Sequence, residues 1–345
     1  MNKQNLFRFS PDPATGRLSD SDTRKYFSII GFATFALMAS SRAASYLVSY
    51  IISRLAPWVF SNDIAYNIVS LIPLYAVGVP IFALILTRLP SISPLPEKMG
   101  GRWWGGLCCS FTMMALGNYV SQILIMWFEA MSGITQTNPV AEATSGSAWW
   151  INLIFIGILA PVLEELIFRR MLCRRLLPLG EGYAILFSAL IFGLCHGNFF
   201  QFFYAFAMGL IFGLVYVKTG RTIYSMLYHV IINILGGVIA PLIIARLDID
   251  ALNAALEAVA ASGYSDMSAL MPFMNILAVL GLYEISVYGA AIVGTVLLIK
   301  ARKKYSLDTG LLAPPREGRV ANVFMNAGVA TALAGFAFIF ITSLL

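Results

Sequence analysis

Two adjacent glutamates, Glu164 and Glu165, lie at the end of a strongly apolar run, within the stretch "PVLEELIFRRM" (residues 161–171). A carboxylate in hydrocarbon costs several kcal/mol unless it is paired, neutralised or faces water. Arg169 follows Glu165 by four residues, so the two side chains share a helix face in the favourable order for an ion pair. Glu164 points about 100° away and lacks that partner. The spacing predicts that Glu165 and Arg169 support the structure and that Glu164 is free to act as a base.

Histidine is rare in this chain, which contains only two, His196 in "FGLCHGN" and His229 in "LYHVIIN". Asn233 follows His229 by four residues, so both side chains occupy one helix face. Two neutral donors directed at one point can stabilise an oxyanion, although a hydrogen-bonded helix-packing pair would show the same spacing. Ionisable residues inside a membrane are functional candidates, and several in one segment favour a catalytic site.

A turn in the sequence tests whether these residues can meet. The stretch "PLGEG" (residues 178–182) predicts an antiparallel hairpin. Glu164 lies 16 residues before Gly180 and His196 lies 16 residues after it, so each is roughly 24 Å from the turn. His229 reaches the same height if this turn extends about 10 Å further into the cytoplasm than the next one.

Composition predicts the elements that position these residues. The chain has 345 residues, of which 59% are hydrophobic and 12% charged, and its mean hydropathy is +0.79. Soluble domains carry roughly twice this share of charge. Runs of about 20 apolar residues can each cross a bilayer. We therefore expect an all-α polytopic membrane bundle of eight to nine spans, at about 27–53, 64–87, 104–128, 149–168, 182–197, 201–217, 222–244, 272–299 and 320–343.

The net charge of +6 is distributed unevenly between the loops. With a cytoplasmic N-terminus, 20 of the 23 lysines and arginines fall in segments on the cytoplasmic side. This asymmetry is typical of a multi-pass protein of the cell membrane. The basic charge is explained by topology, so no nucleic-acid partner is expected, and the expected partners are lipid and a membrane-associated peptide.

We divide the chain into four parts by composition. Residues 1–26 form a polar cytoplasmic tail, and residues 27–148 hold the N-terminal transmembrane helices. Residues 149–244 form a core of four helices that contains the candidate site. Residues 245–345 comprise an external segment, residues 246–270, and the C-terminal transmembrane helices.

Three motifs together resemble the CPBP family of intramembrane proteases, which includes the CaaX prenyl endopeptidase and bacteriocin-processing proteins. The resemblance covers about residues 149–240 and rests on Glu164-Glu165-x-x-x-Arg169, Phe192-x-x-x-His196 and His229-x-x-x-Asn233. It implies an intramembrane endopeptidase in which Glu164 is the general base, aided by His196. It further implies that His229 and Asn233 stabilise the oxyanion, and that Glu165 and Arg169 maintain the site, which lies toward the cytoplasmic half.

The sequence leaves the need for a metal open. Glu164, His196 and His229 could hold Zn²⁺ with a position left for water. There is no H-E-x-x-H motif, and the resemblance favours water activated by glutamate, so no cofactor is expected.

Two functions without proteolysis also fit polar residues inside a membrane: a proton-coupled transporter and a non-catalytic scaffold that binds a membrane partner. A transporter would need further polar groups on a path across the bilayer. Two further intramembrane charges, Arg42 and Glu284, could pair with each other or line an access cavity.

Overall fold

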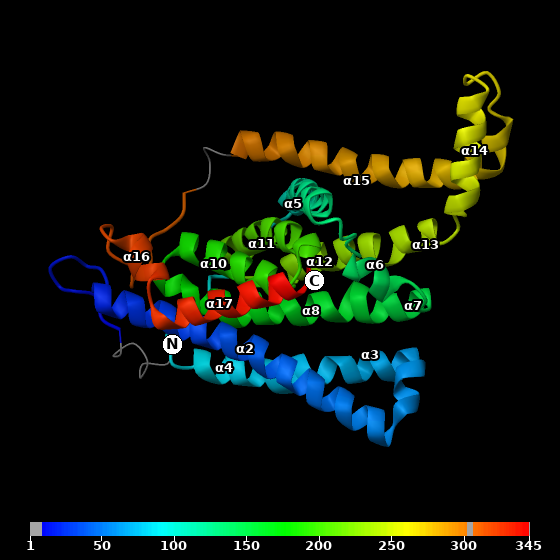
Figure 1. Ribbon diagram of the computed structural model, residues 1–345. Coiled ribbons are helices and arrows are strands. Elements are labelled where there is room, and N and C mark those ends of the chain that lie inside the picture. Colours follow the sequence, from blue (N-terminus) through cyan, green and yellow to red (C-terminus); the bar gives the residue numbers. More distant parts are fainter. Residues whose placement is uncertain (1–8, 302–305, 345) are drawn as a thin grey trace.

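Helices make up almost all of the ordered structure. The computed structural model describes residues 9–301 and 306–344. Among these residues, seven helices are long and apolar enough to cross a membrane, and two further apolar helices are shorter (Figure 1). No strand forms in the described ranges, which contain only one isolated bridge, between Gly180 and Thr309. The all-α bundle predicted from composition is therefore confirmed.

The bounds of the helices agree with the predicted spans to within a few residues in most cases. The seven long helices are α2 (Asp20–Leu55), α3 to α4 (Asp63–Leu86), α5 (Arg102–Ser132), α7 to η5 (Trp149–Leu179), α11 (Phe199–Thr219), α12 to α13 (Thr222–Ile244) and η7 to α15 (Ser268–Ala301). The two shorter ones are α10 (Glu181–Leu194) and α17 (Ala327–Thr342).

The N-terminal segment differs from the predicted polar tail of residues 1–26. Its first eight residues lie outside the described residues. Helix α2 begins at Asp20, several residues before the predicted span, because Ser19 caps it by accepting a hydrogen bond from the Asp22 amide. Phe9 and Leu18 are buried in the core. Part of the predicted tail therefore packs on the bundle and is not a free polar segment.

The C-terminal helix also differs from its prediction. The span expected at 320–343 is divided into α16 (Arg319–Phe324) and α17. Asn326 starts the second helix by accepting a hydrogen bond from the Val329 amide at 3.0 Å. Residues 246–270, predicted to be external, contain α14 (Ile249–Ala261), which stands away from the other helices (Figure 1).

Proline shapes three of the long helices. A short π-helical stretch precedes each of Pro80, Pro161 and Pro241, at η2 (Ile72–Gly78), η3 (Leu153–Leu159) and η6 (Leu235–Ile239). Proline has no amide hydrogen, so a carbonyl one turn earlier loses its donor and the helix adjusts locally. The helix that carries the two glutamates is one of the three.

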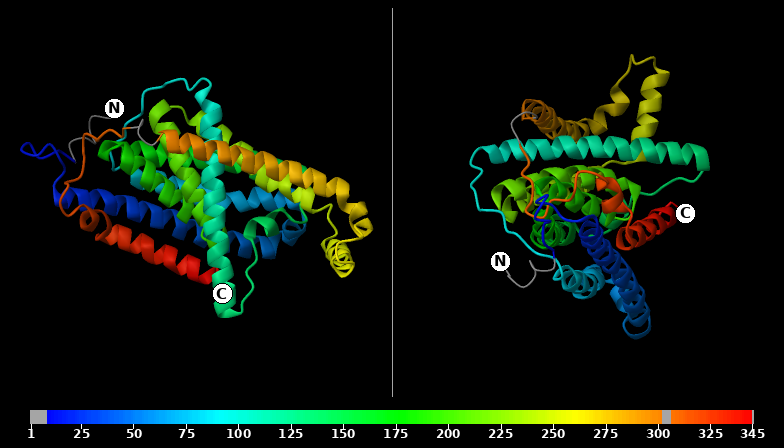
Figure 2. Two further views of the ribbon diagram at one scale, coloured as in Figure 1. Left: turned by 90° about the horizontal axis from the view of Figure 1, so that it is seen from above. Right: turned by 90° about the vertical axis from the view of Figure 1, so that its left-hand side faces the viewer.

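Helix α5 crosses the other long helices at a steep angle (Figure 2). Its close contacts depend on small residues, because a side chain at Gly117 would overlap the backbone of Tyr204 on α11. A side chain at Gly294 on α15 would likewise overlap the backbone of Cys108 on α5. The Thr112 hydroxyl donates to the carbonyl of Ala291 at 2.6 Å and reinforces the second crossing. Small residues permit such close approach of helices in membranes.

The predicted hairpin after the glutamate helix is present. The chain reverses at Gly180, and α10 returns along the helix that carries Glu164 and Glu165. The reversal is fixed from outside, since the Glu181 amide donates to the Asp308 carbonyl at 3.0 Å. Glu181 also forms an ion pair with Lys218 at the end of α11. Helices α8 (Ala160–Glu165), α10, α11 and α12 (Thr222–Ile234) thus form the bundle around the candidate site.

Candidate active site

A buried ion pair forms the base of the site. Glu165 and Arg169 are completely buried, and Arg169 Nε lies 3.1 Å from Glu165 Oε2. Arg169 Nη1 donates to the hydroxyl of Ser188 on α10 at 2.8 Å. The guanidinium also lies over the rings of Phe192 and Phe212, at 5.6 and 5.9 Å from their centroids. Charge pairing and ring faces together account for a fully buried arginine in this position.

His229 lies between the two glutamates. Its Nε2 is 3.7 Å from Glu164 Oε2, and its Nδ1 is 3.5 Å from Glu165 Oε1. The ring is 3% exposed and is held by Phe192 and Phe212, whose centroids lie 5.6 and 5.4 Å from it. A carboxylate that faces one nitrogen of an imidazole orients the ring for work at the other nitrogen. Glu165 is placed to orient His229 in this way, because its carboxylate faces Arg169 on one side and His229 Nδ1 on the other.

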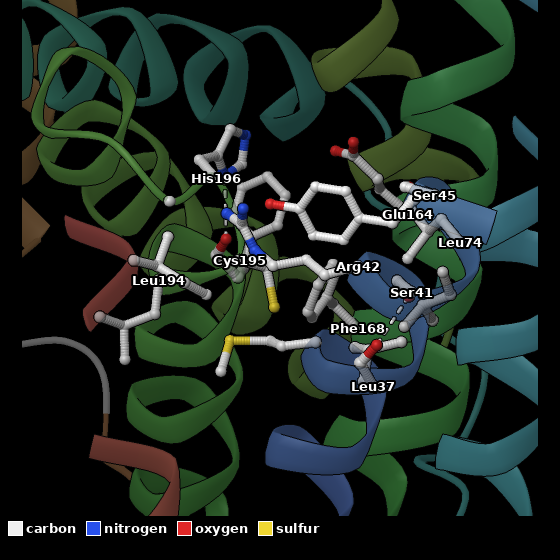
Figure 3. A pocket seen from close by; sticks show the side chains of 16 residues that line it. Leu37, Ser41, Arg42, Ser45, Leu74, Glu164, Phe168, Leu194, Cys195 and His196 are labelled. Atoms are coloured by element: carbon white, nitrogen blue, oxygen red, sulfur yellow. Dashed lines mark hydrogen bonds between the residues drawn. The ribbon is translucent and has the colours of Figure 1, made fainter. Parts of the chain in front are cut away.

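Glu164 differs from its neighbour because its carboxylate reaches a cavity. Its side chain is 24% exposed, whereas that of Glu165 is 0% exposed. The cavity has a volume of about 510 Å³ and is lined by Glu164, His196 and Arg42 among mainly apolar side chains. Figure 3 shows these three residues entering it from different elements. The carboxylate can thus contact water or substrate while it remains beside His229.

The second histidine is held by the turn between α10 and α11. His196 Nδ1 lies 2.9 Å from the carbonyl oxygen of Phe192. A carbonyl only accepts, so Nδ1 carries the proton and Nε2 is left as an acceptor. Gly197 has a positive φ of 68°, which lets the chain turn sharply after His196. Asn198 then caps α11 by accepting from the Gln201 amide and donates to the His196 carbonyl at 2.9 Å.

Asn233 has a structural contact and is not one of the described residues that line the cavity. Its Nδ2 donates to the carbonyl oxygen of Ile156 in η3 at 3.0 Å. The residue five positions after Ile156 is Pro161, which cannot supply the amide hydrogen that a π-helix would use there. Asn233 therefore satisfies a carbonyl that the proline leaves without a donor. One hydrogen of its amide group remains for another acceptor.

The residues considered for zinc do not form a metal site as the structure places them. In the part of the chain that the structure describes, no group of three or more His, Cys, Asp or Glu side chains is arranged to hold a metal ion. Zinc in proteins is held by at least three such side chains around one point. Glu164, His196 and His229 therefore do not fit a zinc site in this arrangement.

The two remaining intramembrane charges, Arg42 and Glu284, differ in their position relative to the cavity. Within the described ranges Arg42 and Glu284 form no ion pair with each other. Arg42 lines the cavity, whereas Glu284 is not one of the described residues that line it. Glu284 lies on α15, beside Tyr283, whose hydroxyl donates to the Leu235 carbonyl at 3.2 Å.

Two contributions to the site were not predicted. Ser188 is the partner of Arg169 and lies four residues before Phe192, on the same face of α10, and eight residues before His196 in the turn that follows. That regular spacing was the available signal. The contact of Glu165 with His229 could not be found from spacing, because it depends on how α8 and α12 are rotated against each other.

The part of the chain that contains these residues is similar to known proteins. Residues 146–235 match the family described as type II CAAX prenyl endopeptidase Rce1-like. A stretch of 90 residues is 34% identical to the membrane-embedded CAAX protease MroQ of Staphylococcus aureus (strain USA300). Residues 146–235 form a CPBP-family domain. All six residues of the predicted site lie in the CPBP domain, whereas Arg42 and Glu284 lie outside it.

The similarity is confined to part of each protein. The alignment with MroQ covers 24% of this chain and 36% of the relative, so the chain matches about a third of the length of that curated protein. No solved structure matches.

Proposed function

We propose that the chain is an intramembrane endopeptidase in which Glu164 activates the water that attacks a peptide bond. The observation that supports this most strongly is the position of the Glu164 carboxylate. It reaches a cavity shared with His196 and lies 3.7 Å from His229. Amide hydrolysis needs a base, a held water and a donor for the oxyanion, in a site shielded from bulk solvent. Residues of these types all lie within the CPBP domain, which supports the proposal.

The remaining residues have distinct roles in this proposal. His196 accepts a hydrogen bond from the same water through Nε2, because its Nδ1 is engaged by the Phe192 carbonyl. His229, when both of its ring nitrogens carry a proton, and the second amide hydrogen of Asn233 stabilise the oxyanion of the tetrahedral intermediate. Glu165 and Arg169 hold His229 in place from behind. Each such donor or base contributes on the order of 10²–10⁴ in rate.

The substrate in this proposal is a peptide or protein segment within the membrane. The relative's name describes a membrane-embedded CAAX protease, and the long apolar helices suit the same environment. We place the protein in the cell membrane with the site toward the cytoplasmic half, on the distribution of lysine and arginine.

The test of the proposal compares membranes that contain wild-type protein with membranes that contain Glu164→Gln. Glutamine keeps the shape of the side chain but cannot accept a proton, so we expect peptides released by wild type to disappear in the variant. Mass spectrometry of the released peptides would detect them and identify the substrate. Glu284→Gln is the matched control, since it alters an intramembrane glutamate that does not line the cavity, and it should release the wild-type set. Unchanged release from Glu164→Gln would reject the assigned base.

We also propose that the reaction needs no metal. The side chains do not fit a zinc site as placed, and glutamate can activate water directly. Dialysis of purified wild-type protein against a strong chelator is expected to leave cleavage unchanged. Loss of cleavage that only added Zn²⁺ restores would overturn this part of the proposal and favour a zinc-dependent protease.

A further inference from the structure

Helix α2, which lies outside the CPBP domain, lines one side of the cavity. Six residues of α2 line it at spacings of one and three and therefore share one face of the helix: Leu37, Met38, Ser41, Arg42, Ser45 and Tyr46. Three of them, Arg42, Ser45 and Tyr46, are exposed. Arg42 is the one charged residue among them. It lies near the middle of the predicted span 27–53, where a cation is costly unless something compensates it.

Arg42 has no such compensation from the described residues. No ion pair or hydrogen bond joins its side chain to another described residue, and it is more than 4 Å from the carboxylate of Glu164. Arg169 is the opposite case, because Glu165, Ser188 and two ring faces satisfy it completely. One intramembrane arginine is thus part of the scaffold, and the other presents its guanidinium to the cavity.

The guanidinium of Arg42 is held on the side of the cavity where α10 turns into α11. Its Nη2 lies 3.4 Å from the place where a side chain at Gly197 would begin. Figure 3 shows it beside His196 and Cys195, separated from the carboxylate of Glu164. A ligand that reaches both Glu164 and Arg42 must therefore extend along the cavity.

We propose that Arg42 binds a carboxylate of the peptide substrate and thereby determines which peptide bond lies at Glu164. This inference rests on the proposed endopeptidase function and deepens it. A planar guanidinium binds a carboxylate through two parallel hydrogen bonds. A volume of about 510 Å³ is within the range of sites for small ligands and admits a short stretch of extended peptide. The carboxylate comes either from the C-terminus or from an acidic side chain.

A phospholipid phosphate is a poorer partner for this position. Headgroups lie at the edges of a hydrocarbon core about 30 Å thick, whereas Arg42 is near the middle of its predicted span. A peptide that enters the cavity can bring its carboxylate to that depth, because Arg42 neutralises it there.

Binding can be measured without cleavage, so that this inference and the proposed function are tested separately. Full-length Glu164→Gln protein, purified in detergent, is incubated with a pool of hydrophobic peptides, and retained peptides are identified by mass spectrometry. Each peptide is present with a free C-terminal carboxylate and as its C-terminal amide. A further set consists of pairs of amidated peptides, and the two members of a pair differ only at one internal position, which is Glu in one and Gln in the other. Arg42→Gln and Arg42→Lys are introduced into the same protein, with Arg54→Gln, near the end of α2, as the control.

We expect carboxylate-bearing peptides to be retained about 10- to 100-fold over their neutral partners, as for hydrogen bonds to a charged group. The acid-terminated and Glu-containing sets show which source of carboxylate is bound. Arg42→Gln should bring the ratio close to one, and Arg42→Lys should keep part of it, since lysine lacks the two-pronged geometry. Arg54→Gln should keep the full ratio.

Equal retention of charged and neutral peptides by the Glu164→Gln protein would overturn the inference. So would a ratio that Arg42→Gln leaves unchanged. Native mass spectrometry that shows an anionic phospholipid lost with Arg42→Gln, while the peptide ratio is unaffected, would overturn it in favour of lipid. None of these results depends on cleavage, so each can occur whether Glu164 is the base or not.

Discussion

Glu164 and Glu165 are identical neighbours in the sequence, yet their carboxylates occupy different surroundings. One residue of α-helix rotates the side chain by about 100°. This rotation turns Glu165 toward Arg169 and into the protein, and turns Glu164 toward the cavity. The same acid is therefore part of a buried ion pair at one position and available for proton transfer at the next.

The buried ion pair gives a stability prediction. Arg169→Met leaves Glu165 as an unpaired charge at a site with no solvent exposure, so we expect the free energy of unfolding to fall by about 3–5 kcal/mol. Denaturant or thermal unfolding in detergent would measure it. Arg170→Met is the matched control, because that neighbouring arginine is exposed, and it should change stability by less than about 0.5 kcal/mol.

A double variant separates the pair from simple loss of volume. Glu165→Gln with Arg169→Met removes both charges, and it should be more stable than Arg169→Met alone. If the two substitutions destabilise additively, the ion pair is not the source of the effect.

At this scale the sequence predicts pairs on one helix but not pairs between helices. The four-residue spacing of Glu165 and Arg169 predicts their contact, and the structure contains it. The contacts of Arg169 with Ser188 and of Glu165 with His229 join different helices. They depend on helix rotation and height, which a uniformly apolar surface does not specify.

At the scale of elements, the proline-interrupted helices are the main feature that positions the site. Pro161 lies three residues before Glu164 and follows the π-helical stretch η3. Pro161 has no amide hydrogen, so the turn before Glu164 would leave the partly buried carbonyl of Ile156 unpaired. Asn233 of α12 supplies the hydrogen bond. This contact ties the helix that bears the proposed base to the helix that bears His229.

This contact predicts a stability effect that depends on the proline. Asn233→Ala should lower the free energy of unfolding by about 1–3 kcal/mol, because the Ile156 carbonyl is left without a donor. Combined with Pro161→Ala, which restores an amide hydrogen, the same change should cost clearly less. Unfolding of the two single variants and the double variant would measure the coupling. Equal costs of Asn233→Ala in both backgrounds would contradict this role for Asn233.

Some elements could be predicted from sequence and others could not. The hairpin at Gly180 follows from its Pro/Gly turn, and most spans follow from apolar length. The steep crossing of α5 has no such signal in the sequence. Gly117 and Gly294 allow the close contacts, but a glycine does not indicate which helix it will contact. The early start of α2 was missed because Phe9 and Leu18 are single apolar residues in a polar stretch.

At the scale of the whole molecule, the basic segments and residues 246–270 lie at opposite ends. Figure 1 shows the N-terminal end of α2 and α16 at one end of the bundle, and α7 and α14 at the other. Residues 300–319 carry six of the 23 lysines and arginines, whereas residues 246–270 carry only Arg246. This arrangement is typical of a membrane protein with its basic end in the cytoplasm.

The arrangement predicts topology. A protease-cleavable tag inserted at residues 262–266, just after α14, should be cut by protease added to intact spheroplasts. The same tag in the loop at residues 90–100 should be protected there and cut in inverted vesicles. The opposite pattern would show that the basic end faces outward.

The central claim is that Glu164 is the base in peptide-bond hydrolysis, and its most direct test is the cleavage rate of purified protein. A peptide identified from the membrane experiment is incubated with full-length wild type and with Glu164→Gln, both checked for equal folding. We predict that kcat falls by at least about 10³-fold in the variant, with cleavage by wild type at a single peptide bond. Cleavage by Glu164→Gln at the wild-type rate would contradict the account.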